Sequence, residues 1–140
     1  REFSAESVQS KMSETSDTGR GSRTLDFSVS ADRRENGIGV VTICGEVDVY
    51  TSPRVRSLML EQFDAGSTSL IVDLAKVDYL DSSGLGILVA GLKRAREHGG
   101  EIYLAGCKPR VLRVLEVTGL NRVFTMVSSV DEAVGKAGGA

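Results

Sequence analysis

Two short acidic segments carry the side chains of this sequence that are best suited to chemistry or recognition. The first is Gly45-Glu46-Val47-Asp48, and the second runs from Asp78 to Gly84. Each follows an apolar run, so each is expected at the carboxyl end of a strand, where α/β sheets place their binding sites. We therefore predict one acidic neighbourhood made of Glu46, Asp48, Asp78, Asp81, Ser82 and Ser83, and neither segment contains Lys or Arg.

Catalysis by a serine of this neighbourhood is disfavoured because no base is placed to activate it. A serine nucleophile needs a neighbouring base and an orienting group. The nucleophile elbow G-x-S-x-G is absent, since Leu80 stands where its first glycine belongs. The single histidine, His98, would lie roughly 20 Å from Ser82 along the helix that joins them. Hydrolysis by two carboxylates needs a cleft, which small α/β domains rarely enclose, so we predict no catalytic residue and no enzymatic activity.

Two further interpretations apply to the start of the helix after Asp81. Gly84-Leu85-Gly86 at a helix N-terminus favours anions. However, Val89 replaces the third glycine of a dinucleotide fingerprint, no Gly-Lys-Ser/Thr follows, and the nearby carboxylates repel an anion. The simpler interpretation is that Ser82 or Ser83 caps the helix and that the glycines allow close packing. A capping hydroxyl at the surface remains open to modification.

The composition of the chain is that of one globular domain. The 140 residues are 41% hydrophobic and 26% charged, with a net charge of −2. No basic stripe suggests direct binding of nucleic acid, and no window approaches the roughly 20 apolar residues of a membrane span. Cys44 and Cys107 are far apart in sequence and form no CxxC motif. We expect reduced thiols in a cytoplasmic protein, with no metal and no cofactor.

The order of apolar patterns predicts an α/β fold. Strands are expected at residues 25–29, 38–44, 69–74, 101–105 and 123–127. Helices are expected at residues 52–66, 82–98, 108–119 and 129–134, with Ser52 and Ser129 as caps. The first two strands should form a hairpin through a turn at residues 32–37, and the sheet should be mixed, with about four to five strands and about four helices. Apolar spacing predicts the buried helix faces Val55, Leu58, Met59, Phe63 and Leu85, Leu88, Val89, Leu92.

The ends of the chain are polar or glycine-rich. Residues 1–22 have few large apolar groups, so we expect a disordered tail, partly of artificial origin, with Met12 as a candidate native start. Residues 23–137 should form the domain, and residues 138–140 should fray.

The segment Val77–Leu88 closely resembles the signature of the bacterial anti-sigma factor antagonists, the STAS domain family. Gly45-Glu46-Val47-Asp48 resembles the second motif of that family. The stretches at residues 99–102 and 115–120 match further landmarks, and the likeness runs from about Leu25 to Val134 in the same order and spacing. The resemblance implies the STAS fold.

The resemblance also implies a partner-switching function in transcription regulation, such as a stress response. An unphosphorylated antagonist binds an anti-sigma factor, which is also a GHKL-type serine kinase, and so releases the sigma factor. The kinase phosphorylates the antagonist, and a PP2C-type phosphatase reverses this. The phosphorylated residue would be Ser82, and the partner-binding residues would be Glu46, Asp48, Asp78, Asp81, Ser83, Gly84 and Leu85. The alternative is a STAS sensor or scaffold that binds a nucleotide or a lipid without kinase switching.

Overall fold

The computed structural model of the chain describes residues 27–139. Its elements, in chain order, are β2 (Ser28–Arg34), β3 (Ile38–Val47), α2 (Ser52–Asp64), β4 (Ser69–Leu80), α3 (Ser82–Glu97), β5 (Ile102–Ala105), α4 (Pro109–Thr118), the 3-10 helix η2 (Leu120–Arg122), β6 (Thr125–Val127) and α5 (Val130–Gly139). The tail expected at residues 1–22 and the first two residues of the strand expected at residues 25–29 lie outside this range.

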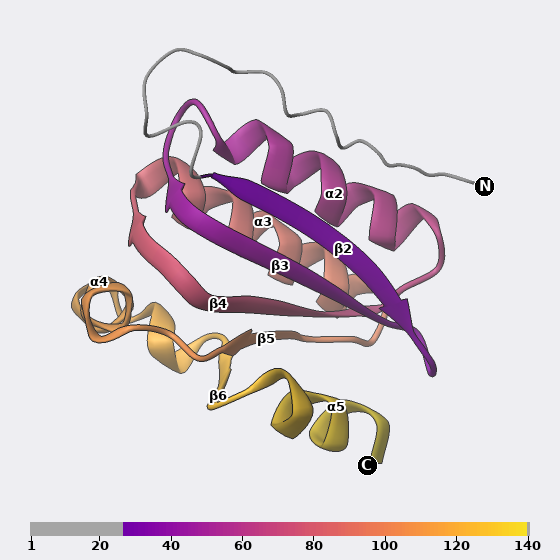
Figure 1. Cartoon of the computed structure of the whole chain (residues 1–140). Helices are drawn as coiled ribbons and strands as arrows, with labels where there is room; N and C mark the ends of the chain where they lie inside the picture. Colours follow the sequence, from indigo (N-terminus) through magenta and orange to yellow (C-terminus); the bar gives the residue numbers. More distant parts are fainter. Residues whose placement is uncertain (1–26, 140) are drawn as a thin grey trace.

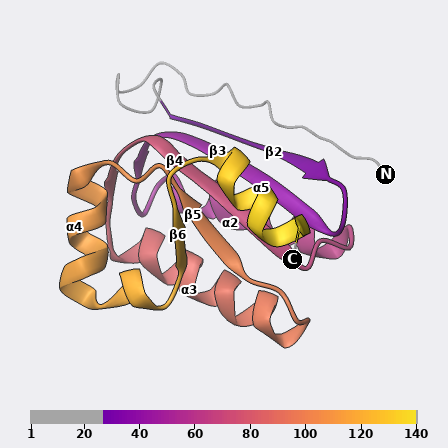
Figure 2. The same ribbon diagram turned by 90° about the horizontal axis from the view of Figure 1, so that it is seen from below.

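The described strands form one five-stranded sheet in the order β2-β3-β4-β5-β6. β2 pairs antiparallel with β3, and the other neighbours pair parallel. Helices α2 and α3 cover one face of the sheet, and α5 lies against the other (Figures 1 and 2). The predicted mixed sheet, its opening hairpin and the four α-helices of residues 27–139 are therefore confirmed.

The central strand β4 is buried on both faces of the sheet. Leu70, Val72 and Leu74 pack into the large core beneath α2 and α3, whereas Ile71 packs into a smaller core beneath α5. A strand covered on both sides needs an almost continuous apolar sequence, which explains the run that begins at Ser69. β4 ends at Leu80, at the end of the sheet where the two acidic segments meet.

The first strand of the opening hairpin ends, and the chain turns, later than predicted. β2 pairs along its full length with β3, from Ser28 opposite Cys44 to Arg34 opposite Ile38. The turn is therefore tighter than the expected residues 32–37, and Asn36 and Gly37 have φ values of 65° and 74°. The charged residues before the turn suggested a loop, but charged side chains also suit an edge strand, whose outer side faces water.

Three other local expectations were wrong. Ser52 is the first residue of α2, and Thr51 occupies the cap position. Val89, expected inside, is 40% exposed, because glycines let another face of α3 pack against the core. Helix α5 continues through Gly139 rather than ending near Val134. Its predicted cap is confirmed, since the Ser129 hydroxyl accepts a hydrogen bond of 3.1 Å from the Glu132 backbone N–H.

Candidate functional site

The two acidic segments lie side by side, as predicted, at the carboxyl ends of β3 and β4. Both strands continue further than expected, and they pair Glu46 with Tyr79 and Val47 with Leu80. The backbone N–H of Asp81 then donates a 3.1 Å hydrogen bond to the carbonyl of Val47. Residues that were expected in two meeting loops are therefore held by strand pairing, which carries a register shift between Gly45 and Glu46. This pairing sets where α3 begins.

The cap of α3 is the Asp81 carboxylate, and the predicted serine cap was wrong. One carboxylate oxygen accepts hydrogen bonds from the backbone N–H of Ser83 at 2.9 Å and of Gly84 at 3.1 Å. The Ser83 hydroxyl donates to the same oxygen. Asp81 adopts an extended conformation (φ −99°, ψ −172°), which aims its side chain at the free N–H groups of the first turn. Ser82 is consequently the first helical residue and not the cap.

The two serines after the cap differ in accessibility. Ser82 is exposed, whereas Ser83 is half-buried and its hydroxyl is bound to Asp81. Among the described residues, the Ser82 side chain has no hydrogen-bond partner within the chain. The Ser82 hydroxyl can therefore contact another molecule freely, whereas the Ser83 hydroxyl would first have to break its hydrogen bond to Asp81.

The capping hydrogen bonds also lower the pKa of Asp81. Partial burial acts to raise this pKa, but the bonds from the Ser83 hydroxyl and from the backbone of Gly84 and Ser83 lower it by more. Asp81 is therefore a carboxylate at neutral pH. Its charge satisfies the positive end of α3, so the strongest anion-binding donors of this helix are already occupied.

Replacement of Asp81 by Ala is expected to lower the free energy of unfolding by about 0.5–2 kcal/mol at neutral pH, because the first-turn N–H groups lose their acceptor. A carboxylate whose pKa is lowered on folding stabilises the fold above its unfolded pKa and loses that contribution as pH falls through its folded pKa. The difference between parent and variant should therefore narrow below about pH 4. Urea unfolding across this range measures it, with Ser82→Ala as the control that leaves the cap intact. An equal difference at all pH values would contradict the assignment.

Gly84 and Leu85 contribute to the site through packing at the start of α3. A Cβ atom on Gly84 would lie 2.6 Å from Cδ1 of Leu80 and 2.9 Å from Cγ1 of Val47. The absence of a side chain thus lets α3 start directly on the ends of β3 and β4. Leu85 is half-buried and packs against the core. Both residues hold Ser82 in place through packing.

The Asp48 carboxylate turns back into its own loop. It accepts hydrogen bonds from the backbone N–H of Tyr50 at 2.9 Å and of Thr51 at 3.0 Å. The buried Thr51 hydroxyl lies 2.8 Å from the carbonyl oxygen of Glu46 and 3.2 Å from the Asp48 carboxylate. The backbone N–H of Asp48 donates to that hydroxyl in turn, at 2.9 Å. The loop between β3 and α2 is consequently closed by a local network that sequence spacing did not predict.

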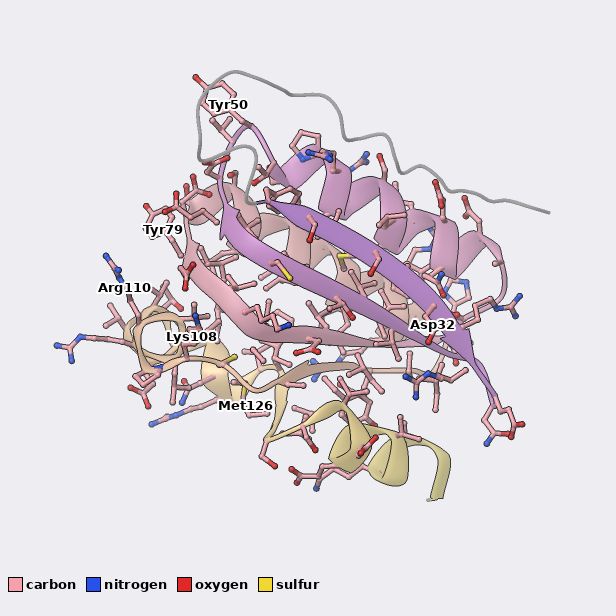
Figure 3. The ribbon with its side chains drawn as sticks, in the orientation of Figure 1. Asp32, Tyr50, Tyr79, Lys108, Arg110 and Met126 are labelled. Carbon is pink, nitrogen blue, oxygen red and sulfur yellow. The ribbon has the colours of Figure 1, made fainter. Side chains whose placement is uncertain are left out.

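The neighbourhood is less acidic than expected because a lysine from a third segment enters it. Lys108, which precedes α4, forms a 2.6 Å ion pair with Asp78. Figure 3 shows Lys108 and Arg110 at the start of α4, on the side of the molecule that carries Tyr79. Lys108 was not predicted at the site, because it belongs to a third segment, between β5 and α4. The pair is largely exposed, so its contribution to stability is at most about 1 kcal/mol.

Bulky apolar side chains point into solvent at the same end of the sheet as the exposed serine. Val49 is 61% exposed, Tyr50 is 81% exposed and Tyr79 is 42% exposed. Figure 3 shows Tyr50 and Tyr79 pointing outward at the end of the sheet where β3 and β4 finish. None of these three residues was among the predicted site residues. Two adjacent large side chains in a loop without helical spacing are the signal that could have found them.

Other candidate groups lie elsewhere or are unsuited to reaction. His98 lies at the far end of α3, where its Nδ1 is 3.0 Å from the Arg94 carbonyl. Burial raises the pKa of the Cys107 thiol to about 11. Within residues 27–139, no three His, Cys, Asp or Glu side chains gather in a way that could hold a metal ion. None of the helices described has the length and apolar character needed to cross a membrane.

Comparison with known proteins relates this arrangement to one family. The sequence profile of the STAS domain matches residues 30–133. An anti-sigma-B factor antagonist of Listeria monocytogenes is 34% identical over 101 residues, which cover 71% of this chain and 88% of the relative. The structure of an anti-sigma factor antagonist from Mycobacterium paratuberculosis superposes with a TM-score of 0.71 at 25% identity and covers 79% of this chain and 93% of that one. The unphosphorylated anti-sigma factor antagonist SpoIIAA shares the fold, with a TM-score of 0.72 at 21% identity over 81% of this chain and 98% of that one.

Proposed function

This chain belongs to the STAS domain family, and we propose that it is an anti-sigma factor antagonist that is switched off by phosphorylation of Ser82. The observation that carries the proposal is the contrast at the start of α3, where Ser82 is exposed while Asp81 occupies the helix N-terminus. The relative from Listeria monocytogenes bears the name of an anti-sigma-B factor antagonist. This role is regulatory and requires no catalytic residue.

The proposed partners follow from the likeness of residues 77–88 to the family signature. The unphosphorylated chain would bind an anti-sigma factor that is also a GHKL-type serine kinase, and a PP2C-type phosphatase would restore it after phosphorylation. The cycle belongs in the cytoplasm, where sigma factors meet RNA polymerase. Glu46, Asp78 and Ser83 belong to the strand ends and helix start that meet at Ser82, and we propose that they lie within the docked area.

The local structure supports a charge-based switch. A phosphate adds about −1.5 to −2 charges at neutral pH. At this position it would lie beside the Asp81 carboxylate, whose hydrogen bonds already use the N–H groups of Ser83 and Gly84. The new charge therefore gains little from the helix and remains directed toward a docked partner. No rearrangement of the fold is needed.

Incubation with the cognate GHKL-type kinase and ATP is expected to add one phosphate, which peptide mass spectrometry should locate on Ser82. Ser82→Ala should remove the modification, because the neighbouring hydroxyl is held by Asp81. Ser83→Ala is the matched control and should still be phosphorylated. A phosphate on Ser83, or no modification by any such kinase, would contradict the proposal. Calorimetry of the unmodified chain with GTP, ATP and fatty acids would then test the sensor alternative.

A further inference from the structure

We propose that Val49 and Tyr50 form an apolar anchor that inserts into an apolar pocket on the anti-sigma factor. This inference rests on the proposed function and specifies what the partner surface must be. The proposed contact is apolar, although the sequence predicts an acidic neighbourhood at this end of the sheet. Asp48 has a positioning role in it, because its carboxylate faces its own loop.

The anchor is defined first by exposure. Tyr50 is 81% exposed and Val49 is 61% exposed, although both are large apolar groups. Keeping such side chains in water costs free energy that burial in a partner would recover. Tyrosine is also enriched among the residues that dominate binding energy, because it offers a large rigid surface with a polar tip. Neither residue packs in the cores of the fold.

The loop that carries the anchor is organised before any partner arrives. The Asp48 carboxylate accepts hydrogen bonds from the N–H groups of Tyr50 and Thr51, and the Thr51 hydroxyl is anchored on the carbonyl of Glu46. Helix α2 begins immediately after this turn, and its Ser52 N–H bonds to the Asp48 carbonyl at 2.8 Å. A loop fixed in this way loses little conformational entropy on docking, so more of the contact energy appears as affinity.

The anchor and Ser82 lie at the same end of the sheet, where β3 and β4 finish. The anchor begins two residues after the end of β3, and Ser82 lies two residues after the end of β4. These strand ends are paired, with Glu46 opposite Tyr79, and Asp81 is bonded to the Val47 carbonyl. Tyr79, 42% exposed, adds apolar surface to this edge. A partner that seats Tyr50 would therefore also cover Ser82, which explains how a single phosphate can oppose apolar docking.

Charge contributes less to this surface than the sequence suggests. Asp48 is bound within its loop, Asp78 is paired with Lys108, and Asp81 is bound at the start of α3. Of the four carboxylates that the sequence placed here, only Glu46 has no such partner among the described contacts. The affinity should accordingly come mainly from apolar contact, and added salt should weaken it little.

The test measures the affinity of the unphosphorylated full chain for its cognate anti-sigma factor by calorimetry. Tyr50→Ala should weaken binding about 30-fold or more, and Val49→Ser should weaken it in the same direction. Tyr50→Phe should remain within about threefold of the parent, because it keeps the ring. Val117→Ala is the matched control, since Val117 is about as exposed as Tyr50 but lies on α4, away from the anchor in the sequence. Raising the salt from about 50 to about 500 mM should change the parent's affinity less than about tenfold.

Asp48 is tested through its coupling to the anchor. Asp48→Ala should weaken binding in the parent but add little in the Tyr50→Ala background, because both changes remove the same contact. Asp48→Asn should keep most of the parent's affinity, since its side-chain oxygen can still accept the hydrogen bonds from the N–H groups of Tyr50 and Thr51. A purely structural role would instead lower affinity equally in both backgrounds.

The outcomes separate this inference from the function it rests on. If the parent binds but Tyr50→Ala binds equally well, or if salt abolishes the binding, the apolar anchor is wrong and the antagonist function stands. If the parent binds no anti-sigma factor while the variants remain folded, the proposed function fails and the anchor fails with it.

Discussion

Phosphorylation of Ser82 is expected to weaken binding to the anti-sigma factor by about 30-fold to several thousand-fold. Burying an unpaired charge in a docked interface costs about 2–5 kcal/mol or more, which corresponds to that range of affinity. The helix dipole would return only about 0.3–1 kcal/mol, and here Asp81 already occupies its N–H groups. Calorimetry with the phosphorylated and unmodified chains measures the ratio directly.

A series of substitutions at Ser82 separates charge from size. Ser82→Asp should bind much more weakly than the parent, whereas Ser82→Asn, which has nearly the same shape without the charge, should lose far less. Ser82→Ala should bind like the parent. Because the site is exposed and the cap belongs to Asp81, none of these changes should alter the circular dichroism spectrum. Equal binding by Ser82→Asp and the parent would overturn the switch.

Among alanine substitutions of the glycines that the structure describes, Gly100→Ala is expected to destabilise the fold most. It should lower the free energy of unfolding by about 3 kcal/mol or more. A Cβ atom here would lie 1.9 Å from the Thr68 carbonyl oxygen and 2.8 Å from the Ser69 hydroxyl. That backbone cannot move aside easily, because the N–H groups of Thr68 and Ser69 both bond to the Gly37 carbonyl. Gly100 itself is tied to the Ala95 carbonyl at 2.8 Å.

Thermal and urea unfolding should show this loss as a fall in Tm on the order of 10 °C. Gly135→Ala is the matched control, because a Cβ atom there meets nothing within 4 Å. Gly135 lies inside α5, so alanine should leave stability unchanged or raise it by up to about 1 kcal/mol. Equal stability of Gly100→Ala and the parent would show that the contact with Thr68 relaxes freely.

The elements of the fold were predictable because their patterns are local. A run such as Leu70 to Leu74 is typical of a strand covered on both faces, and Asn36-Gly37 favours the positive φ values that the hairpin turn has. Boundaries were less predictable, since they depend on neighbours. The charged residues near Arg34 could form either a turn or an edge strand, and their pairing with β3 made them a strand.

The site was predicted in its location but not in its chemistry. The positions of Asp48 and Asp81 after apolar runs placed both at one edge of the sheet, and the structure confirms this. The orientation of each carboxylate could not be read from spacing. Asp81 caps a helix in place of a serine, and Asp48 organises a loop that presents Tyr50.

The sequence by itself determined the alternation of strands and helices, the meeting of two segments at the end of the sheet, and the serine that follows Asp81. These depend on periodicity and on short motifs, which act between near neighbours in the chain. Only the tertiary structure decided that Lys108 pairs with Asp78, that Val89 faces solvent and that Tyr50 stands exposed at the end of the sheet where β3 and β4 finish. Such features depend on packing and on hydrogen bonds between segments far apart in sequence, whose geometry exists only after the chain has folded.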